Sequence, residues 1–346
     1  MKAESAYRCK RDTMTEAGNQ GLQKGNRLTR TTLFNAEGEK LSSKPRLVGG
    51  ISTRILNFTM GGFPWAMDYY RKMTGNFFNP QQFNLTKENK DYASLSDVER
   101  KVYERTILSS MILESILQSN LHDIAPYFSS PDIAAVMATM EYQLVEHCDT
   151  YSQIINSAVP ESRRESVSES WRSVDQIKQK SALYVEQLGK FQKDQQLWEM
   201  YRNLLISATI SGTTVPTEFT VIYALARHSK VVGTSNALKF IQRDLFVQSE
   251  FLQSLIKALV IENQPLGTPE AKKESVELVR ELVKVETDFI HYVSEAMIPG
   301  LSEVMITRFS QSLCNRISKT CALDTIFPGI TMSPIPWFDT FTEVRK

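Results

Sequence analysis

Residues 131–157 read PDIAAVMATMEYQLVEHCDTYSQIINS, and this stretch predicts a long amphipathic helix. Ser130 followed by Pro131 is typical of a helix start, with a cap residue before a proline in the first turn. Beyond it, apolar residues recur at spacings of three and four, as on the buried face of a helix. That stripe includes Met140, Leu144, His147, Tyr151 and Ile154. Its histidine and tyrosine should therefore face the interior, one helical turn apart.

Helices are also expected on both sides of this stretch. Ser96 and Glu99 form a capping box that opens one of them, and Thr268 followed by Pro269 opens another. The expected helices cover residues 96–127, 131–157, 163–190, 195–226, 234–261, 269–295 and 301–320. Alternating strand patterns are nearly absent. Long helices joined by short loops indicate an all-α protein built as a helical bundle.

Three of these other helices carry polar side chains on their apolar stripes. The stripes comprise Tyr103, Ile107, Met111 and Glu114; Leu204, Ala208, Ser211, Val215 and Phe219; and Leu238, Ile241, Leu245, Gln248 and Leu252. Pro216 should distort its helix because it removes a backbone donor. A buried Glu114 needs a cation or hydrogen bonds, since desolvating an unpaired carboxylate costs several kcal/mol. Spacing alone predicts a bundle with a polar core, because a lone buried histidine is more often hydrogen-bonded than metal-bound.

The composition excludes several classes of partner. The 346 residues suffice for one large helical domain or two ordinary ones, and the net charge is only +1. We therefore expect no affinity for nucleic acid or for membrane surfaces. The start lacks the apolar core of a signal peptide, and residues 204–226 contain Pro216 and Glu218, which favours a buried helix over a membrane span. The four cysteines, which form no CxxC pair, indicate a reduced, cytoplasmic chain: Cys9, Cys148, Cys314 and Cys321.

The chain divides unevenly. Residues 1–30 are polar and lack apolar periodicity, so we expect a flexible N-terminal arm. Residues 31–346 then form the helical domain.

Several blocks of the sequence together resemble one known family. They are NFFNP at 76–80, LSDVER at 95–100, YSQIIN at 151–156, RD at 243–244, IPGL at 298–301 and SPIPW at 333–337. Their order and spacing over residues 30–340 resemble the class I ribonucleotide reductase small (beta) subunit. The resemblance implies a ferritin-like fold and a part in deoxyribonucleotide biosynthesis for DNA replication, as the oxidoreductase subunit that makes and stores a radical. It also implies a di-iron or di-manganese cofactor, held by two carboxylates and two Glu-x-x-His pairs.

Carried over position by position, most of the implied metal ligands are missing. Glu114 and His147 are retained, whereas the other four positions hold Leu144, Ser211, Leu245 and Gln248. The radical position corresponds to Tyr151 and the acidic relay position to Asp244. The family's buried tryptophan corresponds to Phe78, which is not readily oxidised. Lys346 lies nine residues after Trp337, so we also expect the family's C-terminal tail to be missing.

These losses predict a protein without a di-metal cofactor. A relocated mononuclear site using Glu114, His147 and Glu141 is an alternative, and Glu218 is a more distant candidate ligand. Without metal, Glu114 and His147 should interact, and we expect Ser211, Gln248 and buried water to complete a hydrogen-bond network around the carboxylate. Replacing Glu114 by glutamine should then affect stability only mildly.

Three functions remain open at this point. The first is a non-catalytic small subunit with a structural or regulatory role. The second is an active, metal-independent subunit that holds a radical on a modified Tyr151. The third is a repurposed ferritin-like binding protein. In the first two cases the expected partners are a second copy in a homodimer, a metal-binding small subunit in a heterodimer, and the reductase large subunit. As a member of this family the chain would not be catalytic alone.

Overall fold

The computed structural model describes residues 27–40, 45–294, 298–330 and 333–341. Long α-helices dominate this part of the chain, where pairing between extended segments is limited to isolated bridges. The α-helices are α2 (Pro64–Thr74), α3 (Glu88–Ser94), α4 (Asp97–Ile124), α5 (Pro131–Ala158), α6 (Glu161–Ser168), α7 (Asp175–Asp194), α8 (Leu197–Thr209), α9 (Val215–Arg227), α10 (Val232–Glu262), α11 (Pro269–Ser294) and α12 (Glu303–Thr320). The predicted all-α bundle is thereby confirmed.

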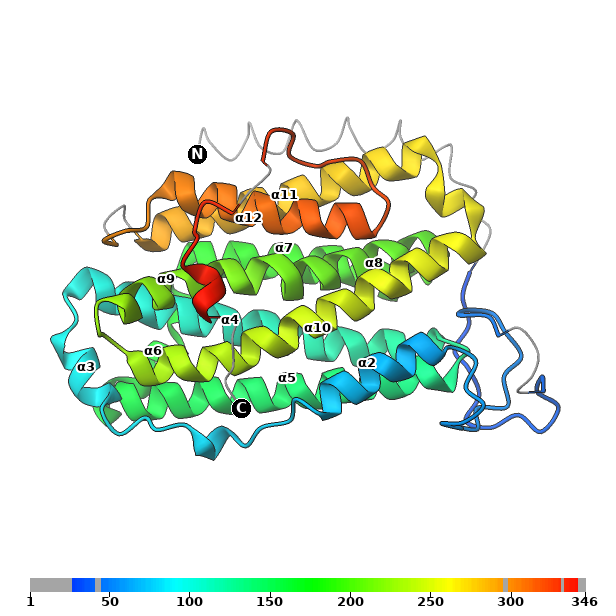
Figure 1. Ribbon diagram of the computed structural model, residues 1–346, viewed down its shortest axis with the longest axis horizontal. Helices are drawn as coiled ribbons and strands as arrows, with labels where there is room; N and C mark the ends of the chain where they lie inside the picture. Colours follow the sequence, from blue (N-terminus) through cyan, green and yellow to red (C-terminus); the bar gives the residue numbers. More distant parts are fainter. Residues whose placement is uncertain (1–26, 41–44, 295–297, 331–332, 342–346) are drawn as a thin grey trace.

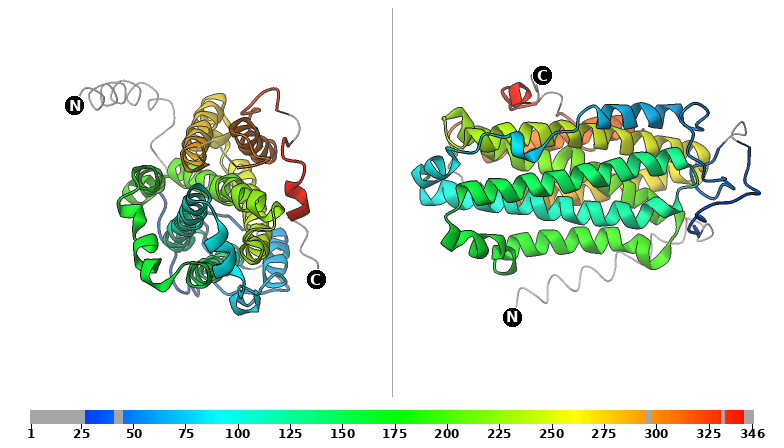
Figure 2. Two further views of the ribbon diagram at one scale, coloured as in Figure 1. Left: turned by 90° about the vertical axis from the view of Figure 1, so that its left-hand side faces the viewer. Right: turned by 90° about the horizontal axis from the view of Figure 1, so that it is seen from below.

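The central bundle consists of α4, α5, α10 and the composite helix formed by α8 and α9. Helix α4 packs along α5, and α8 packs along α10. Helix α7 covers α4 and α8, while α11 and α12 lie side by side as an outer pair above them (Figure 1). Figure 2 shows the same arrangement from the end of the bundle and from below. The polar stripes of α4, α5, α9 and α10 therefore converge on one interior.

The starts of α4 and α5 follow the expected capping chemistry. Ser96 Oγ accepts a hydrogen bond from Glu99 N at 3.2 Å, and the Glu99 carboxylate accepts one from Ser96 N at 2.9 Å. Ser130 Oγ accepts from Asp132 N at 3.2 Å, ahead of the proline in the first turn. Each cap satisfies backbone donors that the helix itself cannot pair.

The expected helix at 195–226 is interrupted by a π-helix at Ile210–Thr214. Pro216 stands in the first turn after it and has no N–H to donate to the carbonyl of Gly212. The wider π-turn accommodates this loss, so the predicted distortion is confirmed. Residues 204–225 are all buried, as expected of a core helix. No helix among the described residues combines the length and apolarity that crossing a membrane requires.

Two expectations about helices were wrong. Residues 163–190 form α6, a short turn and α7 in place of one helix, because the serine-rich break bonds its own backbone: Ser173 Oγ donates to Ser170 O at 3.0 Å. The sequence pattern also missed α2 and α3, which are short and draw their stability from packing against α5. The proposed flexible arm falls mostly on residues 1–26, outside the described residues. From residue 27 the chain is attached to the bundle, where Leu28 N donates to Gln195 O at 2.8 Å.

Candidate functional site

Four of the side chains singled out by the sequence analysis meet inside the central bundle, and all four are fully buried. Glu114 comes from α4, His147 and Tyr151 from α5, and Asp244 from α10. Glu114 Oε2 lies 2.6 Å from His147 Nδ1, and Tyr151 donates its hydroxyl hydrogen to Glu114 Oε1 at 2.5 Å. On the other side of the imidazole, His147 Nε2 lies 3.6 Å from Asp244 Oδ2. The predicted interaction between Glu114 and His147 is confirmed, and the structure shows that it is direct.

His147 is held as an imidazolium between two carboxylates. Burial on its own lowers the pKa of a histidine, but Glu114 first and then Asp244 outweigh it and raise the pKa of His147 to about 9. Asp244 is oriented in turn by Arg243, whose Nε donates to Asp244 Oδ1 at 3.1 Å. The Phe78 ring stacks on the imidazole at a centroid separation of 6.1 Å and an interplanar angle of 8°. The site thus positions one buried cation between two buried anions.

Tyr151 is a neutral phenol with a proton acceptor already in place. Burial, reinforced by the charge of Glu114, raises the pKa of Tyr151 well above its usual value of 10. Its hydroxyl hydrogen points to a carboxylate that already receives a second hydrogen bond from His147. Chemically, this arrangement can take the phenolic proton if the ring loses an electron. It cannot ionise the phenol near neutral pH.

The four residues at the remaining ligand positions implied by the resemblance do not form the hydrogen-bond network expected from the sequence. Leu144 and Leu245 are buried and offer no donor atom. Gln248 donates to Gln143 Oε1 at 3.1 Å and so does not serve Glu114, while Ser211 Oγ has no hydrogen-bond partner among the described residues. The prediction that Ser211 and Gln248 support Glu114 was therefore wrong. Tyr151 and His147 already occupy both oxygens of that carboxylate.

The candidate replacement ligands also lie elsewhere. Glu141 Oε2 faces His122 Nδ1 at 3.3 Å on the outside of the bundle. Glu146, in contrast, adjoins the site: one oxygen accepts a hydrogen bond from Tyr142 at 2.9 Å, and the other is buried without a hydrogen-bond partner among the described residues. Burial raises the pKa of Glu146, opposed by the bond from Tyr142 and by the nearby charge of His147. Glu218 pairs with Lys180 at 2.5 Å. A mononuclear site built from Glu114, His147 and Glu141 is thus not formed, because the outer face of α5 turns Glu141 away from the interior.

These residues do not fit a pair of divalent metal ions. Two such ions need several carboxylates to balance their charge. The described site offers Glu114 and Asp244, both already engaged with His147, and beside them Glu146, which accepts a hydrogen bond from Tyr142. Two of the six family ligand positions are aliphatic, and the amide that stands at a third is committed to Gln143. Nowhere in the described ranges are three or more His, Cys, Asp or Glu side chains grouped so as to hold a metal ion.

A second buried polar cluster was missed by the sequence analysis. Lys180 of α7 lies between Glu218 of α9 and Glu286 of α11, and all three are almost without solvent exposure. A signal for it exists in the sequence. Lys180 falls on the apolar stripe of its helix, with Ile177 and Tyr184, and Glu286 falls on the stripe of residues 279–293. Charged residues on a buried stripe need partners, which here are each other.

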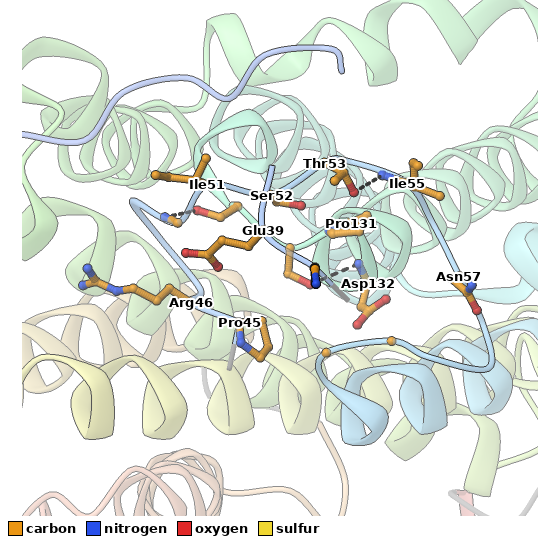
Figure 3. Close-up of a pocket in the computed structure, with 16 residues that line it drawn as sticks. Glu39, Pro45, Arg46, Ile51, Ser52, Thr53, Ile55, Asn57, Pro131 and Asp132 are labelled. Carbon is orange, nitrogen blue, oxygen red and sulfur yellow. Dashed lines mark hydrogen bonds between the residues drawn. The ribbon is translucent and has the colours of Figure 1, made fainter. Parts of the chain in front are cut away.

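A shallow pocket lies at the start of α5, between that helix and residues 45–62 (Figure 3). Gly50 N donates to Ser129 Oγ at 2.7 Å, and Phe63 N donates to Asp132 Oδ2 at 2.9 Å. These contacts attach the extended segment to the end of the bundle. Asp132 precedes His147 by fifteen residues, or about 22 Å along a helix. The pocket is therefore separate from the carboxylate–histidine site.

The fold and this site define a ferritin-like helical protein with an interior carboxylate–histidine–tyrosine cluster. A family model for the ribonucleotide reductase small chain matches residues 56–334. The chain is 24% identical over 300 residues to the ribonucleoside-diphosphate reductase subunit beta of Halalkalibacterium halodurans, covering 87% of each chain. It is 23% identical over 320 residues to the subunit beta of Treponema pallidum, covering 92% of this chain and 91% of the relative.

The fold comparison agrees with the sequence comparison. The ribonucleotide reductase R2 subunit from Clostridium botulinum superposes with a TM-score of 0.88 at 25% identity, covering 92% of this chain and all of the other. This chain belongs to the ribonucleotide reductase small-chain family. Membership confirms the resemblance inferred from the sequence blocks, and the ferritin-like fold with it.

Proposed function

We propose that this chain is a ribonucleotide reductase small subunit that works without a resident di-metal cofactor, as a structural or regulatory partner in the cytoplasm. The observation that carries the proposal is the state of Glu114. Its two oxygens are satisfied by His147 and Tyr151. The charge that metal ions would compensate in a complete site is compensated here by an imidazolium, so the carboxylate has no need of a metal.

The test compares metal binding by two versions of the chain. The wild type is loaded anaerobically with Fe(II) or Mn(II), desalted and analysed for metal. We expect well under one ion per chain. The comparison variant restores the family ligands through Leu144→Glu, Ser211→Glu, Leu245→Glu and Gln248→His, and should bind close to two. Two ions per wild-type chain at high occupancy would overturn the proposal.

Pairing with a second small subunit forms part of the same proposal. The face made by α5, α4 and α7 bears exposed apolar side chains, including Tyr142, Val145 and Val185. Between α4 and α7 it is hollowed by a groove of about 460 Å³, lined by Met111, Ile112, Ile116, Trp171, Val185 and Leu188. Met111 was expected in the core and is only half-buried, on this groove. Either a second copy or a metal-binding small subunit would cover such a face, and the large subunit is the further partner that the family implies.

The hydrogen bond from Tyr151 to Glu114 favours one second candidate, an active subunit that stores a radical on Tyr151 or a modified form of it. Loss of one electron to an oxidant supplied from outside the chain, with transfer of the phenolic proton to Glu114, would leave a neutral tyrosyl radical. Electron paramagnetic resonance of protein purified from its native host decides the matter. A tyrosyl-type signal that Tyr151→Phe abolishes would establish this function, and its absence from active reductase preparations would exclude it.

A further inference from the structure

The cluster of Lys180, Glu218 and Glu286 lies where α11 meets the central part of the molecule. Helices α4, α7, α9 and α11 enclose it, and α11 lies on the outer side with α12 against it (Figure 1). Lys180 is 1% exposed, and the two carboxylates are fully buried. Glu286 is the charged residue that α11 contributes to the cluster.

The two carboxylates differ in how many donors they receive. Glu218 accepts hydrogen bonds from Lys180 Nζ at 2.5 Å, from Ser109 Oγ at 2.5 Å and from Ser110 Oγ. Glu286 Oε2 contacts only the Lys180 ammonium, and Glu286 Oε1 has no hydrogen-bond partner among the described residues. Hydrogen bonds to an ionised carboxylate stabilise its negative charge, and Glu218 receives three of them where Glu286 has only its ion pair with Lys180.

Charge balance then requires one further proton. One ammonium and two ionised carboxylates leave a net charge of −1 in a site that water does not reach, which is costly. Lys180 stays charged: burial lowers its pKa, but the two carboxylates outweigh this and raise it above the usual 10.5. Burial, opposed by Lys180 and assisted by Glu218, raises the pKa of Glu286 to about 8. The proton belongs on the carboxyl with fewer donors.

Among the described residues, the other titratable groups on the helices around this cluster do not take over this charge near neutral pH. The Tyr184 hydroxyl of α7 shares a hydrogen bond with Thr214 Oγ1 at 2.9 Å, and burial raises the pKa of Tyr184 well above its usual value, so it stays neutral. Burial also raises the pKa of the Cys314 thiol of α12 to about 12. The pKa of Tyr201 of α8 is likewise raised to about 12 by burial. Arg105 of α4 lies over the Tyr292 ring of α11, 4.9 Å from its centroid. It is not among the charged groups that shift the pKa of Glu286, which are Lys180 and Glu218.

We propose that Glu286 binds one proton in this cluster and that the bound proton holds α11, together with α12, against the central bundle. When this proton leaves Glu286, an uncompensated negative charge remains where α11 contacts the central bundle. Helix α12 covers the π-helix that carries Ser211, since Cys314 Sγ lies 3.4 Å from Thr213 Oγ1. Loss of the proton therefore weakens the packing of α12 on the π-helix, which lies along one side of the central site.

The sign of the pH dependence follows from the raised pKa. The folded state keeps the Glu286 proton up to about pH 8, whereas the unfolded state releases it near pH 4.5. Stabilisation by this proton is therefore complete below about pH 4.5 and is lost as pH rises through about 8. Between pH 6 and pH 9, these two values predict that opening of α11 becomes about a hundred-fold more favourable.

Hydrogen exchange of the full chain at pH 6 and pH 9, corrected for the intrinsic exchange rate, measures this opening. In the wild type, α11 and α12 should lose protection by roughly that factor. Glu286→Gln, which is neutral at both pH values, should change less than about three-fold. Glu281→Gln, at an exposed position on the same helix, should behave as the wild type does. Equal pH dependence in the wild type and Glu286→Gln would overturn the proposal.

Infrared spectroscopy of the wild type covers the case in which the Glu286→Gln variant fails to fold. With glutamate labelled at its carboxyl carbon, a buried protonated-carboxyl band should be present at pH 6 and should be lost by pH 9. Absence of this band at pH 6 overturns the proposal without use of any variant.

Discussion

At the scale of single residues, the pairing of Glu114 with His147 predicts a pH-dependent cost for Glu114→Gln. His147 has its pKa raised from 6.5 to about 9, so the stability it contributes is present below about pH 6.5 and is lost as pH rises through 9. That shift corresponds to about 3 kcal/mol as an upper bound. The variant should therefore lose up to about 3 kcal/mol at pH 6 and much less at pH 9.5. The mild effect expected from the sequence applies only at the higher pH, because the structure supplies a charged partner.

Urea unfolding at the two pH values measures this difference. Glu141→Gln is the matched control, because it removes a carboxylate of α5 that pairs with the exposed His122 of α4 on the outside of the bundle. Its cost should be under about 1 kcal/mol at either pH. An equal loss for Glu114→Gln at pH 6 and pH 9.5 would show that His147 is not charged in the folded protein.

At the scale of secondary structure, the π-helix brings the backbone of α8–α9 unusually close to α10. A Cβ atom on Gly212 would lie 2.3 Å from Ser249 Oγ, and that hydroxyl is fixed by its hydrogen bond to Ala208 O at 2.9 Å. Gly212→Ala should therefore destabilise the protein by about 1–3 kcal/mol through overpacking.

Gly189 provides the opposite case within α7. A Cβ there meets no atom within 4 Å, so Gly189→Ala should be neutral or stabilising by up to about 1 kcal/mol through helix propensity. Chemical denaturation of both variants tests the pair. Equal effects would mean that the π-helix does not set the distance between α9 and α10.

At the scale of the whole molecule, the exposed apolar face of α5, α4 and α7 predicts a dimer. Stable interfaces of this kind bury about 2,000 Å² or more, and polar substitutions at their centre weaken them strongly. The double variant Val145→Asp/Val185→Asp should sediment as a folded monomer at micromolar concentration, where the wild type should be dimeric.

The control double variant is Ile261→Asp/Val304→Asp. Its two side chains are also apolar and exposed, with 67% of Ile261 and 64% of Val304 accessible to solvent. They lie on α10 and α12, away from the proposed interface. It should remain dimeric. A wild type that sediments only as a monomer, alone and with a metal-binding small subunit, would refute pairing through this face.

The sequence by itself determined the fold class and, through the family resemblance, which residues stand at the expected ligand positions. Capping residues such as Ser96 and Ser130 act within one helical turn, and the apolar stripes repeat within single helices, so both signals are local. Replacing a carboxylate by Leu144 or Leu245 likewise removes ligand chemistry wherever the helix packs. These conclusions needed no knowledge of how the helices are arranged, apart from the family resemblance that aligned the positions.

Only the tertiary structure decided which polar groups pair with one another. Gln248 bonds to Gln143 and not to Glu114, and Glu218 is paired with Lys180 and Glu286, which come from helices far apart in the chain. Such partners depend on how far each helix is rotated and shifted against its neighbours. Those quantities result from packing the whole core, so a stripe shows that a charged side chain is buried but not which partner compensates its charge.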